Sequence, residues 1–268
     1  CMEDGSVGDR YCFSRRCSSV AAVAKEGPKM RAEIKHILRT PLYWLVLIAG
    51  IGARTVFAYL DFKHRLSSYW TLSDEYWSRL GSITVAFLIL LVLIHRFSVD
   101  YENNTYSVIA STAYGRKKLY FERLAAGCLM AILGVVILTI ANIGITLTIG
   151  RSSITPTDWL YGFASHTIAV IVGAVGYFLV SAFVCDAISN HPASMCICGL
   201  PFGISYFINI GTIEKFDLFW FIRYGFFTEL LRGRWISSLP AFWGIWYPVM
   251  IVGVFILSIY RRKERKLL

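Results

Sequence analysis

Long apolar stretches separated by shorter polar segments dominate this sequence. From residue 41 onward, six of these stretches are each close to the roughly 20 residues that an α-helix needs to cross a bilayer. We predict membrane spans at about 41–60, 80–97, 124–149, 161–184, 193–211 and 240–260. The pattern therefore predicts an all-α integral membrane protein with six transmembrane helices, which form a single transmembrane domain over residues 30–268.

The polar segment between the second and third spans has a periodicity of its own. Tyr106, Ile109, Ala110 and Ala113 recur at the spacing of one helix face. We expect this helix to end at Tyr114-Gly115, because glycine commonly follows the last residue of a helix. The basic residues Arg116, Lys117 and Lys118 come directly afterwards. The segment is predicted to be a short helix at the cytosolic membrane surface.

Two further segments are amphipathic. Residues 30–40 place Ile34, Ile37 and Leu38 on one side of a helix and basic residues on the others, which predicts an interfacial helix before the first span. The stretch 212–239, between the fifth and sixth spans, is too aromatic for a free loop and too charged for a span. We expect a re-entrant helix or helical hairpin in the outer leaflet, with a plain interfacial anchor as the alternative.

Residues 1–29 differ from the rest of the chain, since they contain no apolar run. We interpret them as a non-native or upstream-translated extension, with translation beginning at Met30. Lys25-Glu26-Gly27 supports this interpretation, because purine-rich codons for these residues would resemble a ribosome-binding site two codons before Met30. A lipidated Cys1 is the alternative, but it would place the N-terminus outside.

Composition and charge agree with a membrane protein. The 268 residues are 56% hydrophobic and 16% charged, with a mean hydropathy of +0.56. The net charge of +10 comes largely from Lys and Arg at the ends of apolar stretches, where membrane lipids and topology explain it without nucleic acid. Lys and Arg are more numerous on the side of the membrane that holds residues 98–123 and the C-terminal run RRKERK. Because such an excess is typical of the cytoplasmic side, both termini are predicted to be cytoplasmic.

Catalytic and metal-binding motifs are absent from the sequence. It contains no G-x-x-x-x-G-K-[ST], G-x-S-x-G or H-E-x-x-H, and no paired carboxylates within an apolar stretch. Cys196-x-Cys198 lacks the spacing and companions of a zinc site. We therefore expect no catalysis, no metal and no cofactor in this chain, and we interpret Cys128, Cys185, Cys196 and Cys198 as packing residues.

Three polar residues within predicted spans are candidates for a substrate path, namely Arg54, Asn142 and His166. A charged side chain inside a span is costly and is rarely placed there without a role. Arg54 is near the outer end of its span, so its stem could also carry the guanidinium outward, toward Asp61. His166 has a wetted interfacial position as its alternative to a functional role.

The segment 99–123 resembles the loop between spans two and three of ABC-2-type transporter permeases. Glu102, Thr105, the helix, the run from Ser111 to Arg116, and Arg123 at the third span carry the resemblance. It implies a permease subunit that works with separate ATPase subunits and a second permease copy or homologue in a bacterial plasma membrane. ATP and Mg would be bound by the partner, and the cargo would be an exported antibiotic, peptide or lipid-like molecule. By this resemblance the residues that contact the ATPase are Arg31, Lys35, Tyr101, Glu102, Thr105, Arg116 and Lys117.

Two other classes of function stay open at this stage. An ATP-independent secondary transporter or channel would need no ATPase, but ion coupling usually employs buried carboxylates at the bilayer midplane. The predicted spans carry no such carboxylate. A membrane scaffold that transports nothing is the third class.

Overall fold

The computed structural model describes residues 30–63, 76–94, 97, 113–149, 156–188, 190–207, 227–233, 248–253 and 255–256. This part of the chain is almost entirely helical and contains no strand, which confirms the all-α prediction for it. The named helices are α2 (Met30–Arg39), α3 (Pro41–Lys63), η1 (Trp77–Gly81), α5 (Ser82–Phe87), η2 (Leu88–Ile94), α8 (Ala113–Ile149), α9 (Pro156–Ile188), α10 (His191–Phe207) and α11 (Thr228–Leu231). The predicted extension 1–29 lies outside the described residues.

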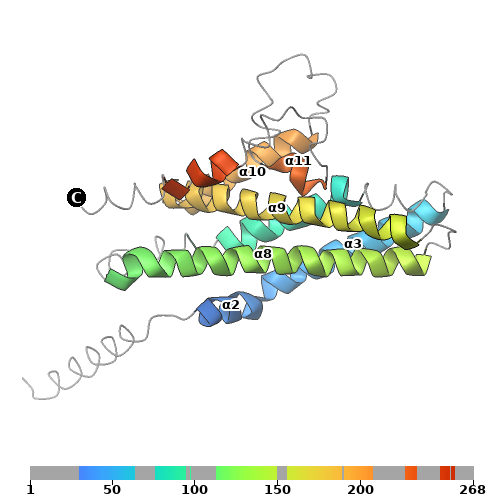
Figure 1. Cartoon of the computed structure of the whole chain (residues 1–268), viewed down its shortest axis with the longest axis horizontal. Helices are drawn as coiled ribbons and strands as arrows, with labels where there is room; N and C mark the ends of the chain where they lie inside the picture. Colours follow the sequence, from blue (N-terminus) through green and yellow to red (C-terminus); the bar gives the residue numbers. More distant parts are fainter. Residues whose placement is uncertain are drawn as a thin grey trace, which may run out of the picture.

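The two longest helices, α8 and α9, run antiparallel and side by side through the middle of the bundle (Figure 1). Helices α2 and α3 pack on α8, whereas α10 and α11 pack on α9. The π-helical segment η2 contacts α3, α8 and α9, so it fills the centre between them. Residues from all these elements form one apolar core, which includes Leu47, Leu88, Met130, Leu138 and Phe178.

Three described helices are long and apolar enough to cross a membrane, and they cover Pro41–Leu60, Leu119–Thr148 and Gly162–Ile188. They coincide with the first, third and fourth predicted spans. Shorter apolar helices, Trp77–Val92 and Pro192–Ile204, fall on the second and fifth. A membrane-embedded protein follows from these helices. The sixth predicted span is described only at 248–253 and 255–256, which are helical, and the six-span topology stays a prediction.

Side-chain hydroxyls and small residues fix how the helices approach one another. The Tyr43 hydroxyl donates to the Met130 carbonyl at 3.3 Å, which joins α3 to α8. The Tyr177 hydroxyl donates to the Cys198 carbonyl at 2.9 Å, which joins α9 to α10. At Gly127 of α8, the Phe178 ring of α9 occupies the space that a side chain would need. The absence of a Cβ at Gly127 therefore lets the two long helices pack closely.

The short helix α11 packs on a face of α9 that is formed by two glycines. A Cβ on Gly173 would lie 2.7 Å from the Leu231 backbone nitrogen, and one on Gly176 would lie 2.5 Å from the Phe227 ring. Phe227 precedes α11 in the left-handed region, with φ 61°, and its side chain is fully buried. Within the predicted re-entrant stretch 212–239, the structure describes only residues 227–233.

The predicted helix end at Tyr114-Gly115 is wrong. Helix α8 begins at Ala113 and continues through Gly115 to Ile149 without a break. Packing downstream of the glycine explains this difference, because Leu119 and Tyr120 are buried and the Tyr120 ring lies 5.9 Å from the Phe97 ring. Such burial outweighs the roughly 1 kcal/mol that a glycine costs inside a helix. The preceding surface helix, over residues 106–112, lies outside the described residues.

We predict that Gly176→Ala destabilises the fold, because the added Cβ would overlap the Phe227 ring. Overpacking of this kind typically costs about 1–3 kcal/mol. The measurement is the midpoint of thermal unfolding in detergent. Gly144→Ala is the matched control, since no described atom beyond its own stretch of helix lies within 4 Å of a Cβ there. Equal midpoints for the two variants would contradict the described packing.

Candidate functional site

Arg54 and Asn142, two of the candidate substrate-path residues, meet in the interior of the bundle. The Arg54 Nε donates to the Asn142 Oδ1 at 2.7 Å, which joins α3 to α8. The Arg54 guanidinium also lies 5.3 Å from the centre of the Tyr76 ring, within cation–π range. Arg54 is only 3% exposed, so its guanidinium lies inside the bundle, and the alternative contact with Asp61 stays a prediction. The Asp61 side chain lies outside the described part of the structure.

The contacts continue from Tyr76 to the segment after α11. The Tyr76 ring contacts the neighbouring Trp77 ring at a tilt of 57°, with centres 4.9 Å apart. A Cβ on Gly233 would lie 3.2 Å from the Trp77 Cβ, and Gly233 has φ +72°, which favours glycine. The Gly233 carbonyl lies 2.7 Å from the His166 Nδ1. Since a carbonyl only accepts, His166 Nδ1 carries the proton, and the half-buried His166 holds the segment after α11.

Two threonines link α8 to α9 beside these contacts. Thr167 follows His166 in α9, and its hydroxyl lies 3.5 Å from that of Thr139 in α8. Thr139 is one helical turn before Asn142. We call this group of residues the polar ring, and its members are Arg54, Tyr76, Trp77, Thr139, Asn142, His166, Thr167 and Gly233. The polar ring joins α3, η1, α8, α9 and the segment after α11.

Two buried donors in the polar ring have no hydrogen-bond partner among the described residues. They are the Asn142 Nδ2 and the Trp77 Nε1. Leaving a buried donor unbonded costs about 1–3 kcal/mol, so native proteins rarely keep one without a reason. A ligand or water that offers oxygen acceptors would satisfy both donors. These two donors make the polar ring the candidate site for a hydrogen-bonding ligand.

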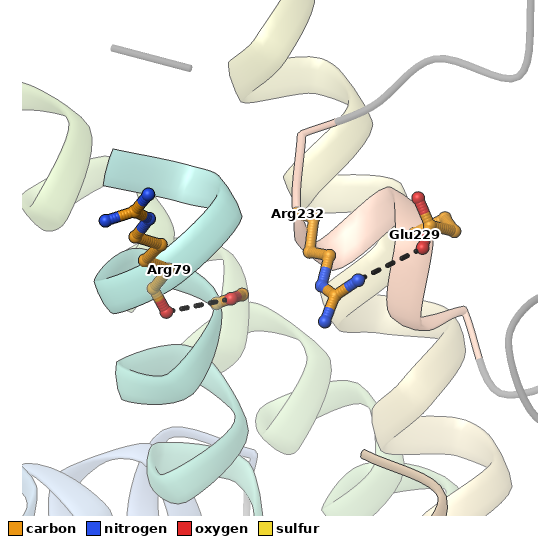
Figure 2. A network of polar contacts seen from close by, with 4 residues as sticks. Arg79, Glu229 and Arg232 are labelled. Carbon is orange, nitrogen blue, oxygen red and sulfur yellow. Dashed lines mark hydrogen bonds and ion pairs between the residues drawn. The ribbon is translucent and has the colours of Figure 1, made fainter. Parts of the chain in front are cut away.

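A part-buried ion pair joins α11 to the residue that follows it, beside the polar ring. The Arg232 Nη1 lies 3.3 Å from the Glu229 Oε1, and the two side chains are 13% and 5% exposed. Figure 2 shows this pair next to Arg79 of η1, whose carbonyl accepts a hydrogen bond from Ser82 at 3.2 Å. Helix α11 is thus a charged but buried element, fixed to α9 by glycine packing and to His166 by a hydrogen bond.

The other end of the bundle carries exposed basic residues. Helix α2 and the start of α8 lie at this end (Figure 1), which we call the basic end. Glu33 of α2 is buried, and its Oε1 lies 3.5 Å from the Nε of Arg123 in α8. Arg31 and Lys35 are exposed on the same helix. The Trp44 indole donates to the Leu38 carbonyl at 2.8 Å, which fixes the end of α2 against α3.

The structure places the candidate ATPase-contact residues only in part. Arg31 and Lys35 share α2, and the backbone of Arg116 and Lys117 lies in the first turns of α8. Helices α2 and α8 are in contact, so these two groups belong to one end of the bundle. Tyr101, Glu102 and Thr105 lie outside the described residues.

Sequence reasoning missed the Glu33–Arg123 pair and most of the polar ring. Glu33 is four residues before Ile37, so both lie on the buried face of α2, and this spacing was an available signal. No such signal existed for Trp77, Thr139 or Gly233, because their partners come from other helices.

None of the four described cysteines forms a disulfide. The Cys185 Sγ lies 3.3 Å from the Ser194 Oγ, and the Cys198 Sγ lies 3.8 Å from the Ser181 carbonyl, so both thiols pack between α9 and α10. Within the described ranges no group of three His, Cys, Asp or Glu side chains is placed to hold a metal ion.

We predict that Asn142→Leu is strongly destabilising, because it removes a hydrogen-bond acceptor from a buried guanidinium. Breaking a buried charged interaction costs about 3–5 kcal/mol. The double variant Arg54→Met/Asn142→Leu should be less destabilised than the sum of the two single variants, since the hydrogen bond between the two residues can be lost only once. Denaturant unfolding in detergent measures these free energies. Strict additivity would contradict a direct Arg54–Asn142 interaction.

Thr148→Val is the control for this cycle. Among the described residues, the exposed Thr148 hydroxyl bonds to carbonyls of its own helix, at 3.0 and 2.9 Å. Its removal should change the free energy of unfolding by no more than about 0.5 kcal/mol.

We predict that His166→Ala loosens α11. Without the Nδ1 donor, the Gly233 carbonyl loses its hydrogen bond to α9. One hydrogen bond contributes about 1 kcal/mol, so the amides of residues 231–233 should exchange with deuterium more than about fivefold faster. Mass spectrometry of peptides from 227–233 measures this exchange. His166→Asn should restore slow exchange, because its amide can replace the donor. Unchanged exchange in His166→Ala would refute the role of the bond.

Comparisons with known proteins leave the family of this chain open. No protein-family model matches the chain, and no curated protein matches it. The resemblance of residues 99–123 to ABC-2-type permeases therefore depends on sequence features alone. The described helices are long and apolar enough for a membrane-embedded protein, and the polar ring and the basic end are its candidate functional regions.

Proposed function

We propose that this chain is the membrane-spanning permease subunit of an ATP-driven transporter of the ABC-2 type. It would work with separate ATPase subunits and with a second copy or homologue of itself in a bacterial plasma membrane. By the resemblance of residues 99–123, the transporter would export an antibiotic, peptide or lipid-like molecule. The chain itself would bind no ATP, because hydrolysis would take place in the partner.

The observation that carries the proposal is the continuity of α8 between the two ends of the bundle. The helix has 37 residues, includes Arg123 near its start and supplies Thr139 and Asn142 to the polar ring. At 1.5 Å per residue, Arg123 and Asn142 are roughly 28 Å apart along the axis. Because α8 has no break, a displacement at the basic end would reach the polar ring without being absorbed by a loop.

The basic end suits contact with a cytosolic partner. Helix α2 lies against α8, and Glu33 and Arg123 join the two helices. A force applied to exposed Arg31 or Lys35 would therefore act on α8 as well as on α3. Coupling by rigid helices in this way is a common means by which one subunit drives a conformational change in another.

The polar ring would serve the substrate. It combines the charge of Arg54 with the two buried donors Asn142 Nδ2 and Trp77 Nε1. These groups favour a cargo with anionic or acceptor oxygens. Movement of α8 would change the distance between Asn142 and Arg54, so the same helix would link ATP use to the cargo site.

Purification from the native membrane in mild detergent, followed by mass spectrometry, tests the proposed class. A stoichiometric partner that contains a G-x-x-x-x-G-K-[ST] sequence would support it. Recovery of the chain alone, under conditions in which a known ABC complex survives, would favour an ATP-independent transporter. A chain that transports nothing in any reconstituted system would be a scaffold.

We predict that Arg123→Glu reduces recovery of the ATPase partner more than about tenfold, because two carboxylates would then face each other between α2 and α8. The swap Glu33→Arg/Arg123→Glu should restore recovery, since it restores an ion pair at this site. The measurement is partner recovery per mole of chain, with gel filtration to show that each variant is folded. Loss of the partner in the swapped variant, despite normal folding, would argue against this coupling route.

A further inference from the structure

The turn from α2 into α3 forms a basic groove on the surface of the bundle. It has a volume of about 570 Å³ and is lined by Ala32, Lys35, His36, Arg39, Thr40 and Pro41. Lys35 and Arg39 are exposed, and they give the groove its positive charge. The groove therefore fits an anionic group.

The walls of this groove are held in place by backbone and side-chain bonds. The Thr40 hydroxyl donates to the His36 carbonyl at 3.1 Å, and the Thr40 amide donates to the Ile37 carbonyl at 3.0 Å. The Tyr43 amide donates to the Thr40 carbonyl at 3.1 Å, so the chain passes from α2 into α3 without a flexible joint. Lys35 and Arg39 are thus presented from a fixed scaffold.

An exposed apolar track begins where the basic groove ends. Pro41 lines the groove, and Leu45 and Ile48 follow it on the same face of α3, with exposures of 61% and 67%. At Gly52, one turn further on, no described atom beyond the adjoining helix lies within 4 Å of a Cβ position. Since α3 is a candidate membrane span, this track faces hydrocarbon unless another protein covers it.

We propose that the groove binds the headgroup of an anionic phospholipid, whose acyl chains lie along the α3 track. Charge selects the phosphate, because Lys35 and Arg39 are cationic at neutral pH. The adjoining apolar track selects a lipid over a soluble phosphate, since only a lipid has a hydrocarbon part to cover it. Basic residues at the membrane surface attract anionic lipids in this way. The site does not depend on the proposed transport function.

Native mass spectrometry of the full chain, titrated with phosphatidylglycerol or phosphatidylcholine in detergent, tests the site. Each Lys or Arg near an anionic surface strengthens binding roughly fivefold, so Lys35→Gln/Arg39→Gln should weaken phosphatidylglycerol binding about 30-fold. Arg31→Gln is the matched control, because Arg31 is exposed on the same helix but does not line the groove. Arg39→Lys keeps the charge and should retain binding.

Three outcomes would overturn the proposal. The first is equal affinity for the two lipids, which would mean that charge does not select the ligand. The second is an equal loss of binding in Arg31→Gln and the double variant, which would indicate general electrostatic attraction without a groove. The third is displacement of phosphatidylglycerol by an equal concentration of glycerol phosphate, which would show that the apolar track is not used.

Discussion

The hydrogen bond between Arg54 and Asn142 is the interaction on which the interior of this bundle most depends. A guanidinium that is 3% exposed inside a membrane protein has to be bonded, because desolvation of a charge costs several kcal/mol. Asn142 meets that requirement at 2.7 Å and ties α3 to α8. The other members of the polar ring extend the tie to η1, α9 and the end of α11. Together, the contacts of the polar ring join five segments of the bundle.

The two ends of the bundle differ in chemistry but share a helix. The basic end presents exposed cations on α2, and the polar ring presents buried donors near the far end of α8. Helix α8 takes part in both, through Arg123 at one end and Asn142 at the other. This arrangement can convert a force at a membrane surface into a change of geometry at an interior polar site.

The sequence predicts the elements of this fold better than their contacts. Apolar length alone identifies the helices at 41–60, 124–149 and 161–184, because the bilayer demands such stretches. The helix end expected at Gly115 is wrong, since burial of Tyr120 overrides a local glycine signal. Arg54 and Asn142 stand out as polar residues in apolar stretches, but their pairing depends on which helices are neighbours. Periodicity carries no information about that choice, so the polar ring could not be predicted as a unit.

Site-specific photo-crosslinking in intact cells tests the central claim that the basic end docks an ATPase. A benzoylphenylalanine at position 31, on the exposed face of α2, is compared with one at position 147, where the native leucine is 58% exposed near the other end of α8. The account predicts an adduct with a subunit that contains a G-x-x-x-x-G-K-[ST] sequence from position 31 and none from position 147. No such adduct from position 31, or equal adducts from both positions, would contradict the account.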